Sequence, residues 1–314
     1  MAGAGAIGSL FAGHLASVAV STVLTRREEH AARLNEQGLM ITGKTERRAK
    51  VLASTDPAEL GEVDLVIIAT KASAVEETAK SMRGHFPNAL VMTVQNGLGC
   101  EEVVARYGDW PIISSVTFMS GNRHSDVHVE YELDTATWMG PWARRPATLE
   151  QVQAVATLIE GSGLKAQAFA DLLPAQWSKL IFNAAVNSIA AITDLPHVKA
   201  FAACERLEDL GHVVRTMMEE GKAVAAALGI ELYEDPWEMN LKATHYGSTD
   251  SEDYAHAPSM LEDVRARRLT EVDWITGAIV RAARETKVPA PINETLYRFV
   301  KARETSWTLD SHNH

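Results

Sequence analysis

The sequence has almost no cysteine and, past its first two dozen residues, no uncharged stretch as long as the opening one. Only Cys100 and Cys204 occur in 314 residues, in unrelated contexts and without metal-ligand spacing. This argues against a disulfide framework and gives no sign of a zinc or other metal site. Residues 2–24 carry no charged side chain, but they lack a basic leading segment and glycines interrupt them, which argues against a signal peptide or membrane helix. We therefore expect a protein of the reducing cytoplasm.

Positive charge is also scarce. The chain has 41 acidic against 30 basic side chains, a formal net charge of -11, which repels nucleic acid and anionic membrane surfaces. We therefore expect a small-molecule partner, and any anion must be met by a local basic pocket. The length of 314 residues predicts two domains. The patterns do not fix an oligomeric state, and a homodimer is compatible with them.

Apolar runs alternate with helical patterns in the first half. Residues 20–24, 63–69 and 89–94 are typical of strands, and residues 28–36 and 74–82 are typical of helices. This alternation predicts an α/β domain with a doubly wound parallel sheet of Rossmann type. A strand-rich section is expected to close this sheet, with strands at 114–118, 127–133, 135–139 and 164–169 and a helix at 149–160.

Helical patterns alone follow Ala175. Apolar residues recur at three- and four-residue spacing over five stretches, 176–192, 207–228, 238–242, 258–286 and 292–304. The sequence therefore predicts a dinucleotide-binding domain over residues 1–170 and an all-helical domain for substrate and catalysis over residues 171–314.

A glycine motif opens the chain. The segment Gly3-Ala4-Gly5-Ala6-Ile7-Gly8 matches G-x-G-x-x-G, and residues 9–16 can form a helix whose N-terminus would face a pyrophosphate. About twenty residues on, where an NAD-specific protein places an acid on the ribose, stand Arg26 and Arg27. Arg26 would accommodate the 2′-phosphate of NADPH, with Arg27 as the nearest substitute. The alternative is a solvated arginine pair at a strand end.

The strand that should precede this motif is short. Only Met1 and Ala2 come before Gly3, whereas a Rossmann unit places a buried apolar strand there. We expect the first strand to be truncated and the natural chain to begin about five to eight residues upstream. Deleting a central strand would leave its neighbours with unpaired backbone groups, unless another segment, with 18–24 the nearest candidate, fills the gap.

Polar residues at strand ends and on one helical stretch are the catalytic candidates. Lys71 and Asn96 each follow a predicted strand, where α/β sheets bind ligands, although Asn-Gly is also a common turn dipeptide. Lys179, Asn183 and Asn187 recur at i, i+4 and i+8, which places them on one helix face. If that helix is buried, a polar ligand would satisfy them; the alternative is a solvent-facing stripe.

A later helical pattern, 258–286, carries Ser259, Asp263 and Glu271. Eight residues correspond to about 80° of helical rotation, so Asp263 and Glu271 are expected to point toward the same neighbour. Nearby arginines favour the alternative of an ordinary charged surface.

Taken together, these motifs resemble the ketopantoate reductase (2-dehydropantoate 2-reductase) family along essentially the whole chain. Blocks in the family's order and near its spacings carry the resemblance: the opening glycines, Thr70-Lys71-Ala72, Gln95-Asn96-Gly97-Leu98-Gly99, Trp177-Ser178-Lys179-Leu180 with Asn183 and Asn187, and Ser259-Met260-Leu261-Glu262-Asp263 before Glu271-Val272-Asp273.

The resemblance implies roles for matching positions. Lys179 would be the general acid and Glu271 its partner near the nicotinamide ribose. The remaining roles divide between substrate, held by Asn96, Asn183, Asn187 and Ser259, and cofactor, contacted by Gly3, Ala4, Gly5, Ala6, Ile7, Gly8, Arg26, Lys71, Asn96, Ser120 and Glu271. Where the family often has a substrate-contacting Asn after the catalytic helix, this chain has His197.

The implied activity is reduction of ketopantoate to pantoate by NADPH, as in pantothenate biosynthesis. Hydride would pass to the ketone carbon while Lys179 protonates the developing alkoxide, without a metal. Two alternatives stay open. One is an NAD(P)-dependent dehydrogenase of another branched or aromatic 2-hydroxy acid, and the other is a degenerate dinucleotide-binding protein without catalysis.

Overall fold

The computed structural model describes residues 1–245 and 257–310. The chain forms two compact units. Unit 1 comprises Met1–Gln95 and Gly99–Leu172, and unit 2 comprises Asn96–Leu98 and Leu173–His314. The short segment Asn96–Leu98 therefore belongs with the second unit, although it lies in the first half of the sequence.

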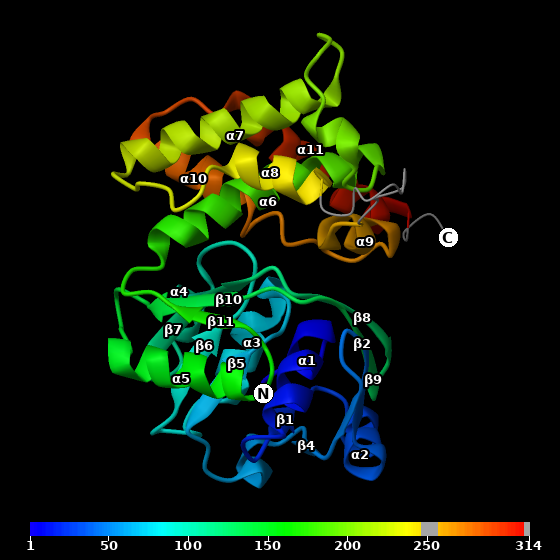
Figure 1. The fold of residues 1–314 in the computed structure, drawn as a ribbon, viewed down its shortest axis with the longest axis vertical. Coiled ribbons are helices and arrows are strands. Elements are labelled where there is room, and N and C mark those ends of the chain that lie inside the picture. Colours follow the sequence, from blue (N-terminus) through cyan, green and yellow to red (C-terminus); the bar gives the residue numbers. More distant parts are fainter. Residues whose placement is uncertain (246–256, 311–314) are drawn as a thin grey trace. The chain divides into compact units, whose positions relative to one another are not determined.

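Unit 1 is built on a twisted sheet whose strands are mostly parallel (Figure 1). The strands are β1 (Thr22–Leu24), β4 (Leu52–Ser54), β5 (Leu65–Ile68), β6 (Leu90–Thr93), β7 (Ile112–Thr117), β10 (Thr137–Pro141) and β11 (Ala166–Ala168). They run in the order β11-β10-β7-β6-β5 and β1-β4, with only the β7–β10 pairing antiparallel. Continuous apolar strands such as Leu-Val-Ile-Ile in β5 are typical of parallel sheets covered on both faces. The predicted α/β class is confirmed.

Met1–Gly3 joins the two parts of this sheet. Ala2 bridges Leu24 of β1 and Ile68 of β5, both in parallel. Its N–H donates to Ile67 O at 2.8 Å, and its carbonyl accepts from Ala69 N at 2.8 Å, while Gly3 N donates to Leu24 O at 2.9 Å. The expectation that β1 and β5 would face each other with unpaired groups is therefore wrong over these residues. The segment 18–24 does not fill the gap but supplies β1 itself.

The helices of unit 1 lie between the strands in sequence. They are α1 (Ala6–Leu15), α2 (Glu28–Gln37), η1 (Pro57–Leu60), η2 (Ala72–Ala74), α3 (Val75–Ser81), α4 (Cys100–Val104) and α5 (Leu149–Gly161). Helix α1 packs between the main sheet and a second sheet, because Leu10 and Phe11 share one buried cluster with Ile67, Tyr131 and Ile41 (Figure 1).

The second sheet of unit 1 was not anticipated. It contains β2 (Leu39–Gly43), β3 (Arg47–Ala49), β8 (Ser120–Ser125) and β9 (His128–Leu133), in the order β3-β2-β9-β8. The strand-rich section thus divides: β7 and β10 complete the main sheet, whereas β8 and β9 leave it. Strand β8 consists of Ser-Gly-Asn-Arg-His-Ser and is largely exposed, so it has no apolar periodicity from which it could be predicted.

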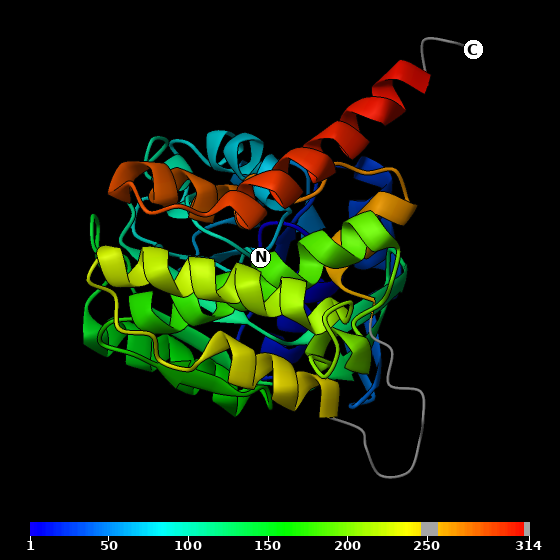
Figure 2. The ribbon, with the colours of Figure 1, turned by 90° about the horizontal axis from the view of Figure 1, so that it is seen from above.

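Unit 2 is helical throughout its described part. It contains α6 (Leu173–Thr193), η3 (Lys199–Ala202), α7 (Leu210–Ala227), α8 (Pro236–His245), α9 (Ser259–Arg265), α10 (Thr276–Thr286) and α11 (Pro291–Asp310). Helix α6 is buried on nearly every side and contributes Leu180, Ile181 and Ile189 to a core shared with Met217 of α7 and Ile279 of α10. In Figure 2 the C-terminal part of α11 (red) extends past the other helices of this unit. None of the described helices combines the length and apolarity needed to cross a bilayer.

The stretch 258–286, predicted as one helix, is broken. Helix α9 ends at Arg265 and α10 begins at Thr276. Arg267 takes a left-handed backbone, with φ of 52°, and ends the helical path. Val272 and Ile275 lie in the non-helical segment between the two helices, yet their side chains enter the same core. For this reason the apolar spacing in the sequence continues across the break. The rotation argument for Asp263 and Glu271 is therefore wrong, because they lie on different elements.

Candidate active site

Helix α6 brings three of the predicted polar residues onto one buried face. Lys179, Asn183 and Asn187 are 4%, 8% and 6% exposed, so they do not form a solvent-facing stripe. Lys179 Nζ donates to Asn96 Oδ1 at 2.9 Å, and Asn183 Nδ2 lies 3.4 Å from the same oxygen. The amide of Asn96 therefore meets one ammonium and one carboxamide inside unit 2.

The loop that carries Asn96 is fixed by close backbone packing. Gly97 has a φ of +92°, and a Cβ at this position would lie 2.1 Å from Trp274 O. Leu98 N donates to the same carbonyl at 2.9 Å. Only glycine fits such a left-handed, tightly packed position. The Asn-Gly dipeptide is thus a turn whose shape holds Asn96 beside Lys179.

Burial changes the acidity of Lys179. Desolvation lowers its pKa from 10.5 to about 7, and the negative charge of Glu271 partly opposes this. A general acid works best with a pKa near the working pH. Lys179 can therefore hold a proton near neutrality and release it to a nearby base.

Glu271 is buried in the segment between α9 and α10. The preceding residue, Thr270, donates both its backbone N–H and its hydroxyl to Glu304 Oε1 of α11, at 2.8 and 2.6 Å. The carbonyl of Glu271 accepts from Trp274 N and Ile275 N, both at 3.0 Å. Sequence reasoning missed Glu304 and Trp274, because no local motif reveals their contacts with this segment.

Asn187 and Ser259 meet at the start of α9. Asn187 Oδ1 accepts from Met260 N at 3.2 Å, and Ser259, the first residue of α9, is half-buried. Asp263, on the same helix, is instead paired with Arg268, with Oδ1 and Nη2 3.0 Å apart. Asp263 is therefore engaged in a local ion pair.

His197 is buried in unit 2. Its Nε2 lies 2.9 Å from Asn240 Oδ1, and its ring packs edge-on against Phe182 and Phe201. Asn240 in turn donates to Phe201 O at 3.1 Å. At the position where the family often has an asparagine, this chain thus has an imidazole packed against two aromatic rings.

In unit 1 the glycine motif leads into an open helix start. Gly5 is the N-cap of α1, no side chain caps this end, and no acid occupies the first turn. A Cβ on Gly8 would lie 2.1 Å from Gly3 O, so Gly8 lets α1 pack on the strand. A Cβ on Gly5 would meet nothing closer than Ala69 O at 4.0 Å. An uncapped helix start beside an exposed glycine is suited to a pyrophosphate.

Two orphaned polar atoms lie near the carboxyl ends of β5 and β6. Thr70 Oγ1 and Gln95 Oε1 are buried without a hydrogen-bond partner among the residues that the structure describes. Gln95 Nε2 donates to Ile68 O at 2.7 Å and Thr70 O at 3.0 Å, which links the two strand ends. Buried atoms without partners are rare in proteins, and a ligand at this edge would satisfy them. Lys71 is exposed directly after Thr70.

The other predicted cofactor contacts of unit 1 lie apart from one another. Ser120 starts β8, and its hydroxyl lies 3.5 Å from Glu132 Oε2. Arg26 is 72% exposed, and its Nη1 lies 3.8 Å from Glu77 Oε2 of α3. Arg26 thus follows β1, and its ion-pair partner belongs to the helix that follows β5.

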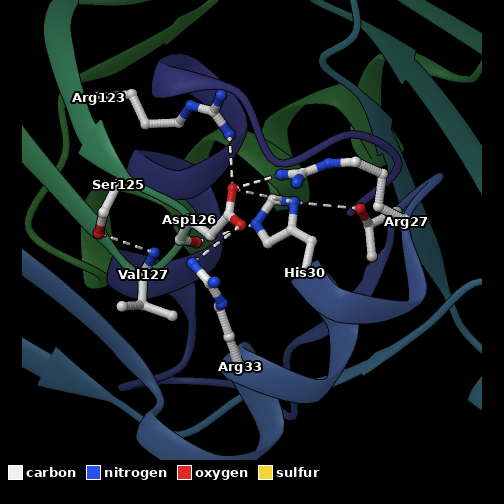
Figure 3. Close-up of polar contacts among 8 residues, drawn as sticks. Arg27, His30, Arg33, Arg123, Ser125, Asp126 and Val127 are labelled. Atoms are coloured by element: carbon white, nitrogen blue, oxygen red, sulfur yellow. Dashed lines mark hydrogen bonds and ion pairs between the residues drawn. The ribbon is translucent and has the colours of Figure 1, made fainter.

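Arg27, unlike Arg26, contacts the second sheet of unit 1. It forms a short ion pair with Asp126, in the turn between β8 and β9 (Figure 3). Arg123 and Arg33 lie 3.4 and 3.7 Å from the same carboxylate, and His30 Nε2 lies 2.9 Å from the Asp126 carbonyl oxygen. Burial opposes ionisation of Asp126, but the bond from Arg27 and the surrounding positive charges bring its pKa below the usual value. Arg27 is therefore committed to this turn and is not equivalent to Arg26.

Comparison with protein families gives two matches that together span most of the chain. A model described as ketopantoate reductase PanE/ApbA matches residues 1–144, and one described as ketopantoate reductase PanE/ApbA C terminal matches residues 171–304. A 2-dehydropantoate 2-reductase of Pyrococcus horikoshii is 30% identical over 303 residues, covering 96% of each chain. That of Archaeoglobus fulgidus is 28% identical, with the same coverage.

Solved structures agree in fold. A PanE/ApbA family ketopantoate reductase from Ralstonia eutropha superposes with a TM-score of 0.84 at 25% identity and covers 100% of both chains. A D-mandelate dehydrogenase in complex with NADH and anilino(oxo)acetate has a TM-score of 0.83 at 25% identity, covering 98% of this chain and 99% of that one. In the described part of the chain, no group of three or more His, Cys, Asp or Glu side chains could hold a metal ion.

Proposed function

Because the chain belongs to the ketopantoate reductase family, we propose that it uses NADPH to reduce 2-dehydropantoate to pantoate. 2-Dehydropantoate is the 2-keto acid after which its curated relatives are named. The observation that carries the proposal is Lys179, a buried lysine with a pKa near neutrality, hydrogen-bonded to Asn96 and within the field of Glu271. Such a group can protonate an alkoxide at physiological pH.

Unit 2 would bind and protonate the substrate. Lys179 would attract the developing negative charge on the ketone oxygen and then transfer its proton there, leaving a neutral amine. The carboxamides of Asn183 and Asn187 and the hydroxyl of Ser259 would bind the polar groups of the keto acid. Asn96 would lose part of its bond to Lys179 as the substrate oxygen replaces it. Glu271 would favour the protonated amine between turnovers.

Unit 1 would bind the dinucleotide. Gly5 and the first turn of α1 suit the pyrophosphate, Arg26 suits a 2′-phosphate, and Lys71 and Ser120 are further contacts. The bound nicotinamide supplies the hydride. The preference for NADPH is supported by the absence of an acid at residues 25–27 and by an exposed arginine, Arg26, just after β1. On charge and composition, we place the reaction in the cytoplasm.

One observation favours a second candidate, an aromatic 2-keto acid. The D-mandelate dehydrogenase that superposes on this chain is complexed with NADH and an anilino-substituted oxoacetate. His197 packs against Phe182 and Phe201, so its surroundings are aromatic. An aromatic substrate would gain from such surroundings.

The two candidates differ in the substrate they turn over. We would follow NADPH and NADH absorbance with ketopantoate, 2-ketoisovalerate and phenylglyoxylate under matched conditions. The proposal expects the highest kcat/KM with ketopantoate and NADPH. A higher value with phenylglyoxylate would transfer the assignment to an aromatic 2-hydroxy acid dehydrogenase. If neither NADPH nor NADH were oxidised with any keto acid, although cofactor binding is measurable, the chain would be a dinucleotide-binding protein without catalysis.

A further inference from the structure

Unit 2 has an arginine-lined cavity away from the candidate active site. Its volume is about 400 Å³, and Asp194, Arg265, Arg267, Arg303, Ser306 and Trp307 line it. We call it the arginine cavity. Asp194 directly follows α6, fifteen residues after Lys179, which corresponds to about 20 Å along the helix. We propose that the arginine cavity binds a small phosphate monoester, a role separate from the proposed reductase reaction.

The charge of the arginine cavity favours an anion. Arg265, Arg267 and Arg303 bring three guanidinium groups to its lining, in a chain of net charge -11. Asp194 is already engaged: its Oδ1 lies 2.8 Å from Arg265 Nε, and its carbonyl accepts from Arg265 Nη2 at 3.0 Å. Arg303 is half-buried, and within the described residues its guanidinium has no hydrogen-bond or ion-pair partner. The Arg303 guanidinium is therefore available to an anion, and guanidinium groups match phosphate oxygens well.

The backbone at the cavity is unusual in two places. Asp194 and Arg267 both have left-handed conformations, with φ of 60° and 52°. Arg267 lies just beyond the end of α9, where glycine or asparagine relieves the strain that a Cβ causes. Arginine occupies this position despite the strain, which is typical of a side chain that has a role in a site.

Size and shape narrow the class of ligand. A volume of about 400 Å³ falls within the usual range for small-molecule sites. Trp307 is half-buried and packs against the core of unit 2, so its indole offers a fixed apolar surface. A ring or other flat group could stack on this surface while its phosphate meets the arginines. A nucleoside monophosphate has both parts and serves as the probe.

The elements around the cavity also support the candidate active site. Helix α6 carries Lys179 and ends at the cavity, and α9 holds both Arg265 and the N–H that Asn187 binds. On α11, Glu304 directly follows Arg303 and fixes Thr270 beside Glu271. A ligand in the arginine cavity would thus contact three helices that position the catalytic candidates.

The test is a calorimetric titration of the full chain with AMP, in saturating NADPH so that AMP cannot occupy a dinucleotide site in unit 1. We expect AMP to bind, adenosine not to bind, and Arg303→Gln to raise the Kd for AMP about tenfold, because one charge-assisted contact is lost. Arg298→Gln is the matched control. Arg298 lies on the same helix, but its guanidinium is exposed and paired with Glu294, so the Kd should not change.

Arg267→Gly keeps the proposal testable if Arg303→Gln folds poorly. Glycine relieves the left-handed backbone, so we expect an unchanged or higher melting temperature together with weaker AMP binding. Equal AMP affinity in the wild type and both cavity variants would overturn the proposal, as would AMP binding no tighter than inorganic phosphate. NADPH oxidation, measured in parallel, reports on the reductase proposal independently.

Discussion

The two units differ in which part of the chain forms the candidate ligand site. In unit 1 the candidate dinucleotide site is made of backbone, because glycines and the uncapped start of α1 leave N–H groups and space. In unit 2 the candidate catalytic site is made of side chains, with one ammonium, several carboxamides and a carboxylate buried around α6. A backbone site is sensitive to added atoms, whereas a side-chain site is sensitive to lost functional groups. Five substitution experiments test this contrast.

The largest effect should come from removing the ammonium of unit 2. We expect Lys179→Ala to lower kcat by about a hundredfold or more, the usual scale for the loss of a general acid, with little change in the Kd for NADPH. Lys242→Ala is the control, because that lysine is exposed and pairs with Glu234. Steady-state kinetics and a binding titration decide the matter. Near-normal turnover in the alanine variant would remove Lys179 from the chemistry.

Adding one carbon to the backbone site should be the next largest effect. Gly8→Ala places a Cβ against Gly3 O, so we expect it to destabilise unit 1 by about 2–3 kcal/mol. Gly5→Ala has room in the protein and should melt like the wild type, yet weaken NADPH by about tenfold if the pyrophosphate approaches there. Chemical denaturation and cofactor titration separate the two. Unchanged NADPH affinity in Gly5→Ala would show that no ligand contacts this glycine.

A smaller effect should distinguish the two neighbouring arginines. Arg26→Ala should weaken NADPH about tenfold and NADH hardly at all, because an exposed contact to the 2′-phosphate is worth the low end of about 1.5–3 kcal/mol. Arg27→Ala removes the pair with Asp126 and should leave the NADPH-to-NADH ratio unchanged. Affinities for both cofactors in both variants provide the answer. If the ratio of NADPH to NADH affinity changed only in Arg27→Ala, Arg27 rather than Arg26 would be the contact of the 2′-phosphate.

The smallest effect is a displaced pH profile. With the pKa of Lys179 at about 7, kcat/KM for reduction should fall as the pH rises above that value, because the neutral amine has no proton to give. Glu271→Gln removes the charge that raises this pKa, so the midpoint should move to lower pH. A midpoint that stays in place or rises would mean that Glu271 does not act on Lys179.

Stability provides an independent reading of the same lysine. Its folded pKa of about 7 lies below the ordinary value of 10.5, so the native state binds fewer protons than the unfolded chain between these pH values. Lys179 should therefore make the free energy of unfolding rise with pH across this window. Lys179→Met should flatten that rise when unfolding is followed from pH 7 to 10.

Local patterns predicted much of the fold because they report on burial along one element. The period of α6 and the apolar runs of β5 and β6 are examples. Strand β8 was missed because its side chains are polar and largely exposed, so they leave no alternating apolar pattern. The break after Arg265 was missed because Val272 and Ile275 keep a helical spacing while entering the core from a turn.

The site was predictable where one motif holds several groups, as in Lys179, Asn183 and Asn187. Contacts between distant segments were not. The hydrogen bond that Thr270 donates to Glu304 joins residues 34 positions apart, and no local motif around either residue predicts it. Arg26 and Arg27 looked interchangeable in sequence, but Asp126, 99 residues beyond Arg27, determines which of them is committed elsewhere. Orphaned atoms such as Thr70 Oγ1 appear only when packing is known.

The affiliation of Asn96–Leu98 with the helical unit has a consequence for protein engineering. A chimera joined at residue 172 would inherit Asn96 from the donor of the nucleotide-binding half and Lys179 from the other donor. Trp274 would then receive a foreign glycine loop. A recombinant built from two homologues therefore needs three junctions, so that residues 96–98 travel with the helices they contact. Shuffling at the apparent boundary alone would separate the candidate catalytic lysine from the amide to which it is hydrogen-bonded.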